Sequence, residues 1–187
     1  MKNEVFLRNL ASGKEKNFSL PMEEKSLEEM LACFGTEYIL VDSSGFFPVE
    51  SEFPDIREIN LSLLSLEEYQ KDNGIGDIEI ATLFAASRLP AKETVNRIIE
   101  GEYSLYDLDA ETAGWNGSDE TKAAIFLSRL FPLEAFRKAF KKNNGIYPDE
   151  LEDYIDWDSV WNEYSLSEGF MLVKHASDSY RTWLVRV

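Results

Sequence analysis

The chain is poor in the residues that most often perform redox, metal and acid–base chemistry. It has one cysteine, Cys33, and one histidine, His175. A single cysteine excludes a disulfide within the chain, which is typical of proteins from a reducing compartment. The first residues contain no apolar segment of a secretory signal, and apolar runs such as 38–41 and 170–173 are too short to cross a bilayer. We therefore expect a cytoplasmic protein.

Basic residues are also scarce relative to acidic ones. The 187 residues include 19 Lys and Arg against 35 Asp and Glu, a net charge of −16. This sign disfavours direct binding to nucleic acid or to anionic membranes, because both would repel the chain. The one basic exception is the region 129–142. Because 44% of the residues are hydrophobic and 13% aromatic, the chain is expected to fold rather than to stay disordered.

The first third predicts two short strands, a helix and a hairpin. Strands are expected at 4–10 and 17–20. The sequence Ser26-Leu27-Glu28-Glu29 is a capping box, which predicts a helix start there, and an apolar stripe continues to Phe34. A turn at 42–45 predicts a hairpin between strands 38–41 and 46–49. The lone Cys33 is expected to pack on this helix rather than to act as a nucleophile.

The remainder predicts a helical middle and a mixed C-terminal region. A second capping box, Ser65 to Glu68, predicts another helix start. Further helices are expected at 80–86, after Pro90, and at 119–131, 133–142 and 148–164, followed by a hairpin of 169–174 and 179–187. The fold class is α+β, an elongated chain. The domains are expected at 1–62 (α+β), 63–110 (mostly helical) and 111–187 (α+β with a closing hairpin).

No set of residues designates an enzyme. His175 has Asp178 and two serines nearby, but a hairpin turn offers no orienting pocket and no oxyanion donors. The pairs Asp107/Asp109 and Asp156/Asp158 could hold a hard cation, although neither belongs to a calcium-binding loop pattern. We expect no catalytic residue, no metal and no cofactor.

The acidic residues form clusters along the whole chain. Six carboxylates lie between Asp149 and Asp158, beside apolar residues that indicate a folded segment. Duplex DNA has one charge per roughly 1.7 Å of axis, so sixteen net charges match about 27 Å of duplex and 35 carboxylates about 60 Å. A phosphate mimic is therefore possible only if the acids gather on one side. Otherwise they are ordinary solvated surface.

The order of several short motifs resembles the ArdA-type antirestriction proteins. The strand Val5-Phe6-Leu7-Arg8-Asn9-Leu10 is similar to that family's opening strand, and Glu37-Tyr38 through Asp42 to its Glu-Tyr…Asp hairpin. Three further segments resemble family motifs: Glu58-Ile59-Asn60-Leu61, Gly101-Glu102-Tyr103 and Tyr154-Ile155-Asp156-Trp157. The likeness covers most of 1–62 and 148–187. The basic region 129–142 and an extra helix within 111–147 depart from it.

The resemblance implies a non-enzymatic DNA mimic that occupies the DNA-binding groove of type I restriction-modification enzymes, chiefly the methyltransferase and specificity subunits, and blocks restriction. It implies a homodimer, with an interface near Trp157, Trp161 and Trp183, although these tryptophans could equally be core. The expected partner-binding acids are Asp42, Glu50, Glu52, Asp55, Glu58, Glu67, Glu68, Asp149, Glu150, Glu152, Asp153, Asp156 and Asp158.

Two other functions stay open from the sequence. One is an anti-CRISPR factor or other defence inhibitor that uses a specific protein–protein surface without mimicry. The other is a metal-dependent enzyme built on the acidic clusters.

Overall fold

The computed structural model describes residues 2–131, 155–174 and 181–187, and its chain divides into two compact units, Met1–Glu102 and Tyr103–Val187. In the described residues it is a mixed α+β protein with seven helices and two three-stranded antiparallel sheets, one in each unit. The predicted α+β class is confirmed at this level. None of the described helices is long and apolar enough to span a membrane.

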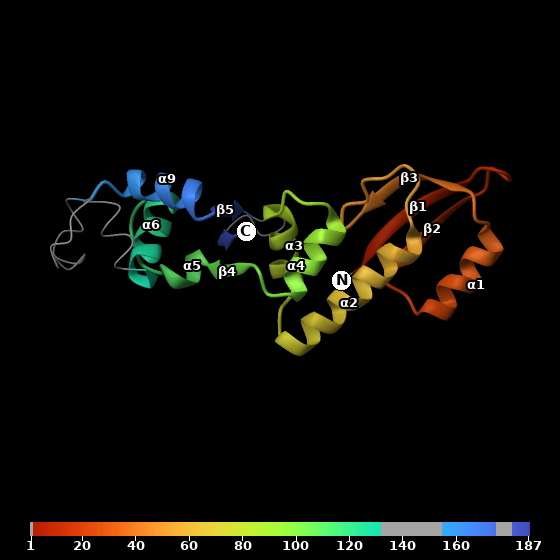
Figure 1. The fold of residues 1–187 in the computed structure, drawn as a ribbon, viewed down its shortest axis with the longest axis horizontal. Helices are drawn as coiled ribbons and strands as arrows, with labels where there is room; N and C mark the ends of the chain where they lie inside the picture. Colours follow the sequence, from red (N-terminus) through yellow and green to blue (C-terminus); the bar gives the residue numbers. More distant parts are fainter. Residues whose placement is uncertain (1, 132–154, 175–180) are drawn as a thin grey trace. The chain divides into compact units, whose positions relative to one another are not determined.

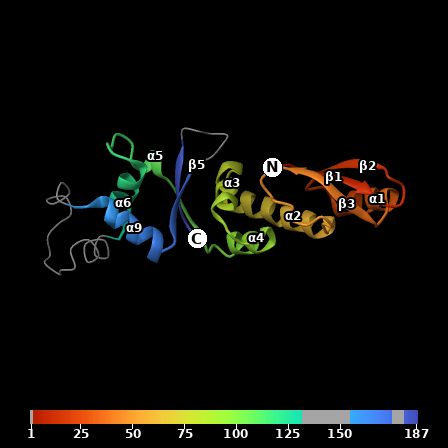
Figure 2. The same cartoon turned by 90° about the horizontal axis from the view of Figure 1, so that it is seen from above.

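The first unit begins with a sheet of β1 (Asn3–Asn9), β2 (Glu15–Leu20) and β3 (Tyr38–Ser44), in the order β2-β1-β3. Alternate residues of β1 are buried, as expected for a sheet with one covered face. The helices α1 (Glu24–Phe34) and α2 (Ile56–Asn73) lie on the same side of this sheet (Figures 1 and 2). Completely buried Val5, Leu7 and Phe18 form part of the core beneath them.

Both predicted capping boxes lie inside helices rather than at their starts. The helix α1 begins at Glu24, so Ser26 is within its first turn. The helix α2 begins at Ile56, and Ser65 lies in its middle. The side chain of Asp55 caps α2 by accepting from the backbone N–H groups of Arg57 and Glu58 at 3.0 and 3.2 Å. Both predicted helix starts are therefore wrong. In α2 the buried residues Ile56, Asn60 and Leu63 precede the box, so the apolar stripe begins well before Ser65.

The predicted hairpin of 38–41 with 46–49 is also wrong. β3 pairs with β1, and residues 46–49 are not a strand. The segment 45–54, called the β3–α2 connection below, is instead attached to β1 and β3 by isolated hydrogen bonds. The Phe47 N–H donates to Asn3 Oδ1 at 3.0 Å, and the Leu40 N–H donates to the carbonyl of Glu52 at 2.8 Å.

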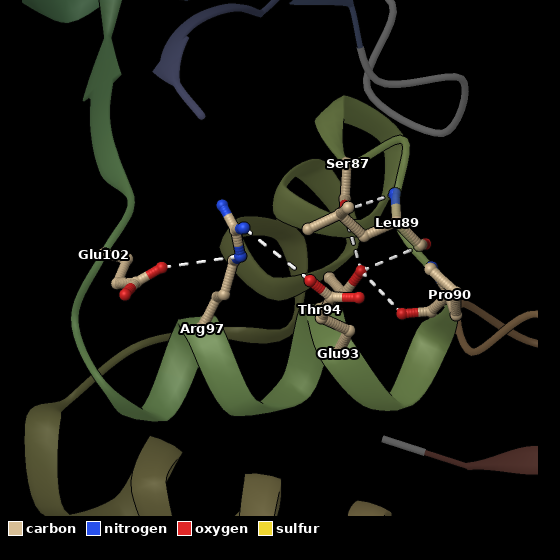
Figure 3. Close-up of polar contacts among 7 residues, drawn as sticks. All are labelled: Ser87, Leu89, Pro90, Glu93, Thr94, Arg97 and Glu102. Atoms are coloured by element: carbon tan, nitrogen blue, oxygen red, sulfur yellow. Dashed lines mark hydrogen bonds and ion pairs between the residues drawn. The ribbon is translucent and has the colours of Figure 1, made fainter.

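The first unit ends with α3 (Asp77–Ala86) and α4 (Ala91–Ile99), as the apolar runs predicted. Figure 3 shows the turn between them, where the Thr94 hydroxyl lies 2.7 Å from that of Ser87 and within hydrogen-bond distance of the Leu89 and Pro90 carbonyls. Arg97 forms ion pairs with Glu93, one turn earlier on α4, and with Glu102, just after the helix. The predicted domain boundary after residue 62 falls inside α2, and the three-domain arrangement stays a prediction.

The second unit contains β4 (Ser104–Asp107), α5 (Leu108–Glu111), α6 (Asp119–Leu130), α9 (Trp157–Ser167), β5 (Phe170–Lys174) and β6 (Thr182–Arg186). Its sheet has the order β4-β6-β5. The predicted C-terminal hairpin is confirmed as the β5–β6 pair, whereas β4 was not predicted. The core gathers buried residues of α6 and α9 around Leu127 and Tyr164.

The predicted helix 148–164 is corrected in its described part. α9 begins at Trp157, and Ile155 and Asp156 are not helical. Asp156 instead caps α9, because its side chain accepts from the backbone N–H of Ser159 at 3.2 Å. Residues 148–154 and the predicted helix 133–142 lie outside the described residues.

Candidate protein-binding surface

Acidic side chains face solvent throughout the described part of the chain. The buried polar side chains there are asparagines, threonines and a serine, with no carboxylate among them. This is the expected result for groups whose charge is costly to desolvate without a partner. The candidate site must therefore be a surface, and its geometry depends on which acids lie together and which are neutralised.

The predicted acids 42–58 lie on one stretch of the first unit. Asp42 is on β3, Glu50 and Glu52 are on the β3–α2 connection, and Asp55 and Glu58 are at the start of α2. Glu50, Asp55 and Glu58 line a common hollow of about 190 Å³. Asp42 lines a separate hollow of about 340 Å³ together with Glu4.

These five acids differ in how they are used within the fold. Glu58 is ion-paired with the Lys92 ammonium, whose hydrogen bond to that carboxylate raises the pKa of Lys92. Asp55 is the N-cap of α2. By contrast, no Lys or Arg of the described residues forms an ion pair with Asp42, Glu50 or Glu52. These three exposed carboxylates, called the unneutralised acids below, can interact with solvent or with a partner.

The two predicted acids in the middle of α2 point in different directions. A helix turns about 100° per residue, so Glu58, Glu68 and the outward Leu61 lie on one exposed stripe. Glu68 is about 15 Å along the axis from Glu58 at 1.5 Å per residue. Glu67 is on the other side of the helix, next to buried Leu66, and is partly covered.

Of the C-terminal acidic cluster, only Asp156 and Asp158 are described. Both are exposed. Hydrogen bonds from the Ser159 hydroxyl and backbone lower the pKa of Asp156, whose carboxylate caps α9. Asp158 lies in the first turn of that helix, where a negative charge interacts favourably with the helix dipole. Asp149, Glu150, Glu152 and Asp153 lie outside the described residues.

The predicted interface tryptophans differ in exposure. Trp157 is 9% exposed and Trp183 is 4% exposed, so both belong to the core of the second unit. Trp161 is partly exposed and packs against the same cluster. Trp157 and Trp183 are therefore core residues, which was the alternative interpretation of these tryptophans. Among these tryptophans, only Trp161 retains appreciable surface for a second subunit.

The other chemical candidates have structural roles or lie elsewhere. Asp107 caps α5 and is ion-paired with Arg181, while Asp109 accepts from the backbone N–H of Thr182 at 2.7 Å. Within the described residues, no group of acidic, histidine or cysteine side chains could hold a metal ion. Cys33 is exposed, which corrects the expectation that it has a packing role on helix α1. The residue His175 lies outside the described residues.

One feature of the surface was not predicted from the sequence. Phe53 and Leu10 are 63% and 53% exposed and line the same open groove of about 470 Å³, together with Tyr38 and Pro54. An isolated phenylalanine between Glu52 and a proline in an acidic segment was the available signal. We call this the Phe53 groove.

A scan against protein-family models and searches of curated proteins and of solved structures found no match to this chain. The surface itself must therefore supply the functional argument.

Proposed function

We propose that the protein is an ArdA-type DNA mimic that occupies the DNA-binding groove of type I restriction-modification enzymes and blocks restriction. Its partners are the methyltransferase and specificity subunits, and it acts without catalysis, metal or cofactor. The observation that best supports this function is the set of unneutralised acids, Asp42, Glu50 and Glu52. They are exposed, and nothing in the described residues neutralises their charge.

The physical basis is electrostatic substitution. A groove that evolved to bind phosphates is lined with Lys and Arg, and fixed carboxylates satisfy the same cations. The backbone under two of these acids is anchored, since β3 pairs with β1 at Asp42 and the Glu52 carbonyl accepts from the Leu40 N–H. Anchored charges lose less conformational freedom on binding than charges on a free tail.

The protein is also proposed to form a homodimer. A homodimer doubles the net charge of −16 and lengthens the acidic surface offered to one enzyme. Of the three tryptophans expected at the interface, Trp161 is the one that has surface available for this contact. Measuring the mass of the purified protein over a range of concentrations, for the wild type and Trp161→Ser, tests this part separately.

The decisive experiment is restriction of unmodified phage by a type I host with and without the protein. Rescue of plating is expected. The purified enzyme should also lose ATP-dependent cleavage, and duplex DNA should compete with the inhibitor. An abundant, folded protein that neither rescues plating nor competes with DNA contradicts the proposal.

A charge-matched pair of variants tests the surface. The test variant is Asp42→Asn/Glu50→Gln/Glu52→Gln, and the control changes three exposed acids of the second unit, Glu111, Glu120 and Glu163, to glutamine. At roughly 0.5 kcal/mol for each exposed charge pair, the test variant should bind the enzyme about tenfold more weakly. Equal weakening by the control means that net charge, and not this surface, is recognised.

The Phe53 groove favours a second candidate, a defence inhibitor that uses a specific apolar contact without mimicry. Salt separates the two candidates. Binding of a mimic should weaken steeply between 50 and 200 mM salt, because charge–charge attraction is screened. Binding through an apolar contact alone should change little.

A further inference from the structure

The Phe53 groove combines exposed apolar surface with an acidic rim. Its apolar part is Leu10, Tyr38, Phe53 and Pro54, and its rim includes Glu37 and Asp55. A large aromatic side chain left 63% exposed forgoes most of the stabilisation that its full burial would supply. Exposed apolar surface with a polar rim is typical of interaction sites.

The backbone around the groove is fixed by hydrogen bonds from several elements. The Leu10 N–H donates to the Glu37 carbonyl at 2.9 Å, and the Phe53 N–H donates to the Ser51 hydroxyl at 3.1 Å. Tyr38 packs on Phe34 with ring centroids 6.2 Å apart, and burial raises the pKa of its phenol. The backbone of the groove and the Tyr38 ring are therefore positioned before a partner arrives, which reduces the entropy cost of binding.

The charges at the rim select a cationic occupant. The one basic residue of the lining, Arg57, is already bound through Nε and Nη2 to the carboxylate of Glu28, at 2.5 and 3.0 Å. This hydrogen bonding lowers the pKa of Glu28. In the described residues no cation forms an ion pair with Glu37, and Asp55 accepts only from backbone N–H groups at the start of α2. The rim therefore has an excess of negative charge.

We propose that the Phe53 groove binds an arginine side chain on a loop of the partner protein. Arginine fits this surface best because its guanidinium stacks on aromatic rings while its donors bind carboxylates. The aliphatic part lies on Leu10 and Phe53, and the guanidinium reaches Glu37. This inference rests on the proposed function for the identity of the partner, a DNA-binding subunit rich in arginine. It adds a contact that phosphate mimicry alone does not supply.

The first experiment tests the groove without any restriction enzyme. The probe is the peptide acetyl-Leu-Arg-Leu-amide, and its matched control replaces arginine with the neutral isostere citrulline. In an NMR titration of the full chain, the arginine peptide should give saturable shifts at the amides of Leu10, Glu37 and Phe53. Equal shifts with both peptides, or shifts spread over all exposed acids, overturn the inference.

The second experiment measures the complex with the type I enzyme. Phe53→Ser should weaken binding about 10- to 30-fold, as for an interface anchor, while leaving the salt dependence unchanged. Leu166→Ser is the matched control, since Leu166 is 86% exposed in the second unit, and it should change affinity less than about twofold. Both residues are on the surface, so unfolding temperatures should match the wild type.

The outcomes separate the two proposals. A peptide that saturates the groove while the chain fails to inhibit the enzyme supports the groove and contradicts the proposed function. Inhibition that is the same for Phe53→Ser and wild type supports the function and overturns the groove. Loss of concentration-dependent self-association in Phe53→Ser identifies a second copy as the occupant and also overturns the inference.

Discussion

Asp55 has two roles, as a helix cap and as a surface charge, and mutations can separate them. Its carboxylate accepts two backbone N–H groups at the start of α2, from Arg57 and Glu58. It is also one of the acids proposed to face the partner. Asp55→Ala removes the acceptor and the charge, whereas Asp55→Asn removes the charge and keeps an acceptor of nearly the same shape. The neighbouring Glu52→Gln removes one charge from a side chain without an ion pair among the described residues.

The magnitudes follow from the cap geometry. Replacing an N-cap residue by alanine costs about 1 kcal/mol, and loss of the charge near the helix N-terminus adds roughly 0.3–1 kcal/mol. We therefore expect Asp55→Ala to lower the free energy of unfolding by about 1–2 kcal/mol and Asp55→Asn by about 0.5 kcal/mol. For a unit of about 100 residues, 1 kcal/mol corresponds to a shift of about 4–8 °C in Tm. Glu52→Gln should be within about 0.5 kcal/mol of the wild type.

Urea unfolding followed by far-ultraviolet circular dichroism gives these values, provided that the m-value stays constant. Target binding is measured on the same three variants. All three should weaken binding by a similar small factor, because each loses one negative charge. If Asp55→Asn is as destabilising as Asp55→Ala, or if Glu52→Gln is as destabilising as either, the capping argument is refuted.

Two further predictions concern the second unit. Asp119 accepts from the Lys174 ammonium at 2.8 Å and from the Thr182 hydroxyl at 3.2 Å, and the hydrogen bond from Lys174 lowers its pKa. A lowered carboxyl pKa stabilises the fold above the unfolded value near 4 and ceases to do so as pH falls through the folded value. Asp119→Asn should therefore cost about 1 kcal/mol at pH 7, and its stability should converge with that of the wild type as the pH falls through the lowered pKa of Asp119. Leu127→Ala, at a completely buried position, should cost about 2–5 kcal/mol in urea unfolding, whereas Leu130→Ala, at a 43% exposed position, should cost far less.

Helices were easier to predict from the sequence than their starting points. The apolar stripes of α1, α3, α4 and α6 lie where the periodicity indicated them. Both Ser-Leu-Glu-Glu boxes failed as starts, because a capping signature is local and cannot show whether the helix has already begun before it. The pair Asp55 and Glu58 has the same spacing and marks the actual start of α2.

Strand pairing was predictable only where the partners adjoin in sequence. The β5–β6 hairpin follows from two apolar runs near the C-terminus. β4 has four residues and pairs Ser104 with Arg186, so no local pattern indicates it. The turn at Gly45 is present, but the chain after it leaves the sheet, and Phe46 and Phe47 pack on Phe84 of α3. Burial against a distant helix determined that path.

The sequence identified which residues are acidic but not what each acid does. Asp55 and Asp156 cap helices, Glu58 and Asp119 are ion-paired, and Asp42 stays exposed without an ion pair among the described residues. These roles depend on where helices begin and on cations that are distant in the chain. A charge count treats all of these carboxylates alike, whereas the fold leaves only some of them available to a partner.

The β3–α2 connection places two kinds of contact on one anchored segment. Glu50 and Glu52 are unneutralised acids, and Phe53 follows them directly. Long-range charge mainly accelerates encounter, while desolvated apolar contacts mainly slow dissociation. Neutralising the two glutamates should therefore lower the association rate and its salt dependence, and Phe53→Ser should raise the dissociation rate. A surface of charge alone would change only the first rate, so measuring both on one segment distinguishes general attraction to a basic groove from selection of a particular enzyme.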